Sequence, residues 1–245
     1  MGSPLKRQRD AILLRVARNE PTADQSDAAS PVLAASADSL HIALVEFEQD
    51  KLALKEFDSR AQKIEHKRSV LIPKYQPMVE AYLEADETYQ NPMFSDLIVW
   101  LFDVEELGLA IDWCVTAIEK GIPTPDNFKR KWPEVCADAV LEWAEQTQSS
   151  GNSVEPYFSD VLEKIESTWV VNEKLHAKWL KFAGYALITN EEGDVKASHV
   201  GEVETLQKAQ ALLIKAENKN PKAGVGTKLK DIKARIRALE EGTNL

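Results

Sequence analysis

The chain has 245 residues, of which 44% are apolar, so it is long enough to bury a substantial core. Charged residues make up 29%, and the net charge of −10 excludes a general nucleic-acid binder, in which Lys and Arg dominate the surface. Gly and Pro are scarce, at 10 and 11 residues, and β-branched residues do not accumulate in alternating runs, so the composition predicts an all-α protein.

Residues 1–37 are predicted to form a basic N-terminal arm followed by a flexible linker. The segment 5–19 has the spacing of a short amphipathic helix that carries five cations, and residues 20–37 are rich in Ala, Ser, Asp and Pro without periodicity. We call these five residues the arm cations and expect them to bind DNA: Lys6, Arg7, Arg9, Arg15 and Arg18.

Residues 38–74 are predicted to form a long helix over about 40–70, with N-cap oxygens from Asp38 and Ser39. Apolar residues recur in it at a spacing of seven, which suits either an ordinary core-facing helix or an oligomerisation helix. The oligomerisation candidates are Phe47, Leu54, Phe57, Ala61 and Ile64.

Positive charge gathers again near the end of this helix, before an expected break at Pro73. The cations expected to contact DNA here are Lys63, Lys67 and Arg68. The next stretch, 75–119, holds ten acids and no Lys or Arg. Such segregation is expected when one surface binds DNA and another avoids it.

Residues 75–190 are predicted to form a Trp-rich helical body of antiparallel hairpins. The first hairpin pairs 92–102 with 105–120 and ends at Gly121 as a C-cap. Further helices are expected over about 133–148, 156–169 and 172–188. Most tryptophans, and both cysteines, occupy core positions of these helices.

Trp132 is interpreted differently from the other tryptophans, because it follows three basic residues in a segment that resembles a loop. A tryptophan in such a place can stack on a base or contact a protein. The sequence therefore predicts a partner-binding site that consists of Lys129, Arg130, Lys131 and Trp132.

Residues 191–245 are predicted to form a C-terminal helical pair, near 201–218 and 226–241, with the glycines at 224–228 as the turn between helices. This turn lacks the order of a phosphate-binding loop. The four histidines have no zinc spacing, and no nucleophile motif or membrane-spanning apolar run is present. The sequence thus predicts no catalytic residue, no metal site and no cofactor.

Several stretches, taken in order, resemble the small terminase subunits of peduovirus-type tailed phages. The resemblance covers nearly the whole chain and is strongest between residues 99 and 131. The similar stretches are Ser3-Pro4 with Arg7, 63–73 with Tyr75, 99–103, 109–111, 117–121, Pro125 with 129–131, 153–156 and 177–178.

This resemblance implies a non-catalytic, ring-forming subunit that binds double-stranded viral DNA near the cohesive-end site and recruits the large ATPase and nuclease subunit. It would act in the cytoplasm of the infected bacterium. Some relatives end in a Lys/Arg-rich tail, which is absent from residues 240–245, so we expect DNA contact at the arm or the 60–74 patch. Two alternatives are a helical-repeat scaffold that binds only protein and a metal-dependent nuclease.

Overall fold

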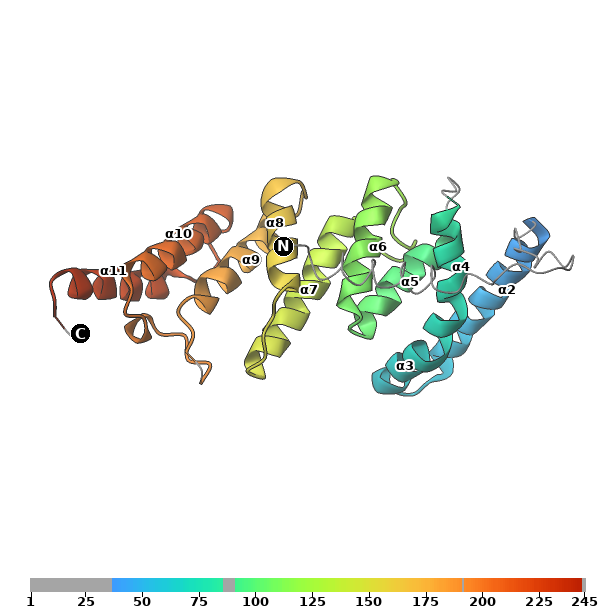
Figure 1. Cartoon of the computed structure of the whole chain (residues 1–245), viewed down its shortest axis with the longest axis horizontal. Coiled ribbons are helices and arrows are strands. Elements are labelled where there is room, and N and C mark those ends of the chain that lie inside the picture. The colour runs from blue at the N-terminus through green and yellow to red at the C-terminus, as the bar shows by residue number, and fades with distance from the viewer. Residues whose placement is uncertain (1–36, 86–90, 191, 244–245) are drawn as a thin grey trace, which may run out of the picture. The chain divides into compact units, whose positions relative to one another are not determined.

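The computed structural model describes residues 37–85, 91–190 and 192–243 (Figure 1). These residues form helices joined by short turns, without a strand, and one isolated bridge links Thr189 to Val195. The all-α prediction is confirmed. None of the described helices is long and apolar enough to cross a membrane. The chain divides into two compact units, Met1–His66 and Lys67–Leu245, and the finer division into four segments stays a prediction.

The first unit contains α2 (Ala37–Ala53) and α3 (Arg60–His66), so the prediction of one continuous helix over 40–70 is wrong. A 3-10 turn at Leu54–Glu56 ends α2, and Phe57 is extended. Ser59 then begins a new helix: its Oγ accepts from the Gln62 amide at 3.1 Å, and the Gln62 Oε1 accepts from the Ser59 amide at 3.1 Å. This reciprocal capping box satisfies two backbone donors and stabilises a helix start inside the expected helix.

The second unit begins with a π-helical segment, Lys67–Leu71, that leads directly into α4 (Ile72–Glu84). The predicted break at Pro73 is therefore wrong. Pro73 stands within the first two positions of α4, where a helix needs no backbone donor, and Pro77 is accommodated inside the helix. Tyr75 and Val79 are fully buried.

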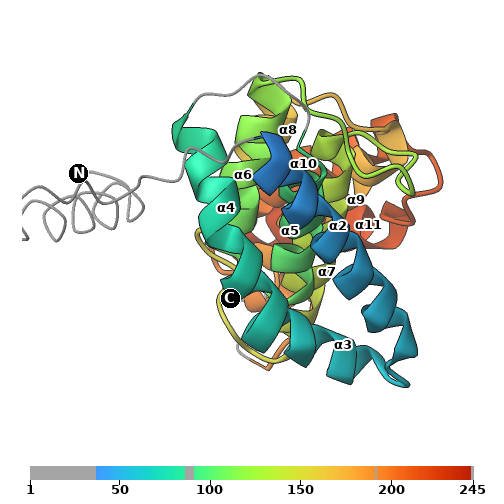
Figure 2. The ribbon, with the colours of Figure 1, turned by 90° about the vertical axis from the view of Figure 1, so that its right-hand side faces the viewer.

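The predicted hairpin is formed by α5 (Pro92–Asp103) and α6 (Leu107–Glu119), and α4 lies beside α5 (Figure 1 and Figure 2). Asn91 caps α5, since its Oδ1 accepts from the Met93 amide at 3.0 Å. Gly121 ends α6 at φ 67°, with the Ile122 amide donating to Ala117 O at 2.9 Å, so the predicted C-cap is confirmed.

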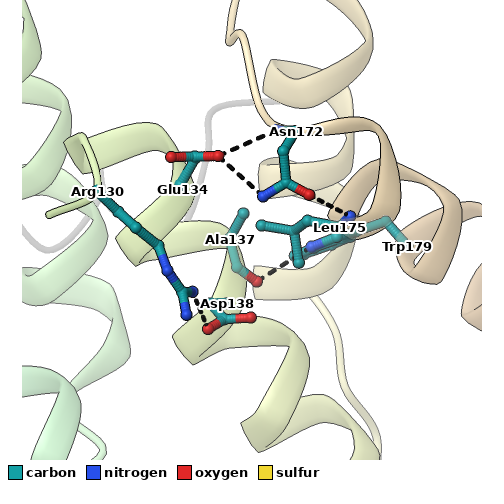
Figure 3. Close-up of polar contacts among 7 residues, drawn as sticks. All are labelled: Arg130, Glu134, Ala137, Asp138, Asn172, Leu175 and Trp179. Carbon is teal, nitrogen blue, oxygen red and sulfur yellow. Dashed lines mark hydrogen bonds and ion pairs between the residues drawn. The ribbon is translucent and has the colours of Figure 1, made fainter.

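The middle of the unit consists of α7 (Trp132–Ser149), α8 (Tyr157–Ser167) and α9 (Glu173–Ala186). Trp179 of α9 is fully buried, stacks on Phe158 at 4.7 Å between ring centroids, and donates its indole N–H to Ala137 O at 3.0 Å. Asn172 caps α9 and also donates its Nδ2 to Glu134 Oε1 at 2.9 Å (Figure 3). These bonds fix α7 against α9.

The unit ends in the predicted pair, α10 (Val203–Lys219) and α11 (Gly226–Glu240), which pack against each other, while α10 also packs on α9. Their shared core includes Leu206, Ala209, Leu213, Leu229 and Ile232. Gly184 of α9 permits close approach to α10: a Cβ added there would lie 2.7 Å from Leu213 Cδ2. The glycines at 224–228 form the turn before α11, as predicted.

Candidate nucleic-acid interface

The arm cations lie outside the described residues, so their role stays a prediction. Among the other predicted DNA contacts, Lys63 is half-buried in the first unit, whereas Lys67 and Arg68 begin the second. Both cations have partners within the protein, although Arg68 itself is exposed. Lys67 Nζ lies 2.6 Å from Asp103 Oδ2 and 5.8 Å from the centroid of the Trp100 ring.

Arg68 binds the same corner of the α5–α6 hairpin, where its Nη2 donates to Val104 O at 3.0 Å. The side chains of Lys67 and Asp103 are only 15% and 30% exposed, so the ion pair is partly shielded from water. The structure therefore brings Lys67 and Arg68 together as groups that hold the hairpin corner. In the free protein, Lys67 is already paired with Asp103, and Arg68 already donates to Val104 O.

The basic triplet Lys129, Arg130 and Lys131 is exposed on the segment before α7. Arg130 forms an ion pair with Asp138 of α7, six residues beyond the helix start (Figure 3). The hydrogen bond to Asp138, and the charge of that carboxylate, raise the pKa of the Arg130 guanidinium. A partner-binding role of the triplet stays a prediction.

The placement of Trp132 in a loop was wrong. It is the first residue of α7, its ring is 3% exposed, and its indole N–H donates to Ile122 O at 2.9 Å. Because Pro133 lies within the first two helical positions, the helix starts at Trp132 and turns the ring into the core. The indole N–H of Trp132 is thus already bonded within the protein, and a partner-binding role of this residue stays a prediction.

The predicted oligomerisation residues also separate in the structure. Phe47 and Leu54 are buried, Phe57 and Ile64 are half-buried, and Ala61 is exposed. The break between α2 and α3 falls between Leu54 and Ala61, so these residues do not form one continuous seam of a single helix. Their role in self-association stays a prediction.

A basic segment that the sequence analysis did not single out lies at 219–239. It holds seven Lys or Arg and a single acid, Asp231, in a chain whose net charge is −10. Two of its cations fasten α11 to the segment before α10: Lys228 Nζ donates to Val195 O at 2.6 Å, and Arg235 Nε donates to Val200 O at 3.1 Å.

Three further cations of α11, Lys230, Lys233 and Arg237, are exposed. Their spacing of three and four residues places them along one side of the helix. Within the part of the chain that the structure describes, the side chain of none of the three makes a hydrogen bond or an ion pair. We call these three residues the α11 cationic face. The sequence signal that marks it is this spacing next to the apolar stripe of Leu229 and Ile232.

The described residues were compared with the arrangements that hold a metal ion or carry a reactive thiol. No three His, Cys, Asp or Glu side chains there lie close enough to hold a metal ion. Cys114 and Cys136 are fully buried free thiols, and burial raises the pKa of Cys136 well above its ordinary value. Inside an apolar core such thiols are inert.

Comparison with known proteins places this helical chain in a family. Residues 44–174 match the family model of the phage small terminase subunit. A probable terminase, endonuclease subunit, of Haemophilus phage HP1 is 36% identical over 82% of this chain and 70% of its own length. The terminase, endonuclease subunit, of Escherichia phage P2 is 25% identical over 69% of this chain and 66% of its own length. No solved structure matches. The chain therefore belongs to the family of phage small terminase subunits.

Proposed function

We propose that the chain is the DNA-recognition subunit of a phage packaging terminase. It binds double-stranded viral DNA near the packaging, or cohesive-end, site and recruits or regulates the large subunit that carries the ATPase and nuclease. The observation that carries this proposal is family membership over residues 44–174, together with a relative that matches 82% of the chain.

The subunit itself contributes no catalytic group in this proposal. Two relatives are named as endonuclease subunits of terminases. We assign the nuclease chemistry to the large subunit, because the sequence contains neither a phosphate-binding loop nor a zinc or nucleophile motif. Incubation of the purified chain with duplex DNA and Mg²⁺ or Mn²⁺ tests this assignment. Specific cleavage by the chain alone would overturn it in favour of a metal-dependent nuclease.

Self-association is the second part of the proposal. Several subunits, arranged in a ring, present their arm cations together in the cytoplasm of the infected bacterium. Five cations bind duplex DNA weakly, but linked copies bind with avidity. Light scattering of the purified chain measures the oligomeric state, and a monomer at concentrations that bind DNA would remove the avidity argument.

DNA binding is tested by fluorescence anisotropy of the full chain with labelled duplex DNA over a range of salt concentrations. We expect affinity that falls as salt rises, since phosphate contacts release counterions. A variant with all five arm cations replaced by Gln is expected to bind more weakly. Binding to the large subunit without any DNA affinity, even at low salt, would instead support the protein-binding scaffold.

A further inference from the structure

The C-terminal helix α11 combines a buried side with a strongly basic exposed side. Ile232 is fully buried and Leu229 is 8% exposed, and both pack in a core with Leu206 and Leu213 of α10. Lys230, Lys233 and Arg237 are exposed on the same helix. The apolar residues therefore fix the helix while its cations remain available to a partner.

Two side-chain hydrogen bonds fasten α11 to the segment before α10. Lys228, the third residue of the helix, and Arg235, the tenth, donate to the carbonyl oxygens of Val195 and Val200. Hydrogen bonds from charged donors are stronger than those between neutral groups. A helix fastened at two points loses little further backbone freedom when it binds, so its cations are already positioned for a ligand.

We propose that the α11 cationic face contacts the phosphate backbone of duplex DNA. This inference rests on the proposed DNA-binding function and names a surface for it within the described residues. The family comparison matches residues 44–174 and therefore does not include this helix.

The spacing of the face fits a polyanion. With a helical rise of 1.5 Å per residue, Lys230 and Arg237 are separated by about 10 Å along the axis. Each strand of a duplex carries one phosphate per about 3.4 Å along the duplex axis, so three cations spread over about 10 Å can meet more than one phosphate. Lys and Arg are the residues that bind phosphate, and two flexible lysines tolerate variation in backbone position.

The chemistry of the face also indicates which part of DNA it contacts. The segment 219–239 contains no aromatic residue, so it offers no platform on which unpaired bases stack. Glu240 and Glu241, both exposed, close the C-terminal end of the helix and repel phosphate there. Contact is therefore centred on Lys230 and Lys233, and a contact with phosphates positions the duplex without reading its sequence.

The test is a full-length triple variant, Lys230→Gln, Lys233→Gln and Arg237→Gln, measured by fluorescence anisotropy with a labelled duplex of arbitrary sequence. Gln has nearly the helix propensity of Lys and Arg, so α11 is expected to remain folded. We expect affinity at about 50 mM salt to fall by about tenfold or more, and the slope of log affinity against log salt to shrink by about 2 to 3.

The matched control replaces Lys174, Lys178 and Lys208 with Gln. It removes three exposed cations from two other helices of the same unit, to which no binding role is assigned, and it changes the net charge equally. We expect this control to retain DNA affinity close to that of the unchanged chain. Circular dichroism and thermal unfolding of both variants identify any loss of affinity that comes from unfolding.

Each outcome decides the matter. If the unchanged chain binds no duplex DNA, the proposed function fails and this inference fails with it. Equal losses in the two variants would show a general effect of net charge, and an unchanged affinity in the α11 variant would leave the function standing without this surface. An α11 variant that keeps DNA affinity but loses the large subunit would assign the face to an acidic protein instead.

Discussion

Two cationic segments of the second unit use the same side-chain types in opposite ways. Lys67 and Arg68 bind a carboxylate and a carbonyl at the α5–α6 corner, whereas the side chains of Lys230, Lys233 and Arg237 make no hydrogen bond or ion pair within the described residues. The acid that binds Lys67 is Asp103, which belongs to the acidic stretch 75–119. Part of the charge segregation along the sequence thus serves tertiary structure, and a run of cations does not by itself identify a DNA-binding surface.

The largest expected effect comes from disrupting the apolar core that α10 and α11 share. Leu213 of α10 is fully buried against this helix pair, and replacement of such a residue by Ala costs about 2–5 kcal/mol of stability. We expect Leu213→Ala to lower the urea midpoint and to weaken DNA binding as the pair loosens. Undiminished DNA binding by a variant whose helix pair has melted would show that the cations need no fixed helix.

Lys67→Ala tests the difference between cations that bind within the protein and cations that are exposed, because it removes one of the first kind. This change leaves Asp103 without its partner and removes the cation–π contact with Trp100, so we expect a loss of about 1–2 kcal/mol. Urea unfolding measures the loss. The matched change Lys230→Ala is expected to alter stability by no more than about 0.5 kcal/mol. If the two stability changes are equal, the division into inward and outward cations is wrong.

A smaller effect sharpens the comparison within α11. Arg235→Ala removes the hydrogen bond to Val200 O, and we expect about 1 kcal/mol of destabilisation together with a DNA affinity reduced less than in the α11 triple variant. Thermal unfolding and anisotropy of the same sample measure both quantities. An affinity loss as large as that of the triple variant would make Arg235 itself a phosphate contact.

The smallest expected effect is a pH dependence at His176, in the first turn of α9. Burial lowers the pKa of His176 below its ordinary value of 6.5, and the charge of Lys219 lowers it further. The His176 Nε2 is buried without a hydrogen-bond partner among the described residues. The unfolded chain then takes up a proton before the folded chain does, so stability falls as pH drops below about 6.5.

Urea unfolding at about pH 7.5 and about pH 5.5 measures this loss, with His176→Gln as the control variant. Because Gln does not titrate, we expect a smaller difference between the two pH values in the variant. The same difference in both proteins would assign the acid sensitivity to other groups.

Much of the helical fold was predictable because its signals are local. The helix ends at Gly121 and Asn91, and the apolar stripes of α9 to α11, depend on neighbours a few residues away. The signal for the break before α3 was also local, since Ser59 and Gln62 have the spacing of a capping box. It was missed because the apolar spacing of seven residues favoured one continuous helix.

The site was less predictable because its contacts join distant residues. Lys67 meets Asp103 across 36 residues, and the Trp132 indole N–H meets Ile122 O across ten. Periodicity gives no information on such pairs. The cations at 230, 233 and 237 are different, because their helical spacing is readable without a structure; the nearby acids at 240 and 241 obscured it.

A contact that the α11 cationic face makes with phosphates has a mechanical consequence for the proposed function. Phosphates repeat along a duplex regardless of the bases they join, so a surface that carries only cations encounters nearly the same energy at every base-pair step. Such a surface binds a duplex without fixing its position along the axis, so the duplex can slide. DNA held in this way can be drawn onward by a motor without breaking base-specific bonds at each step.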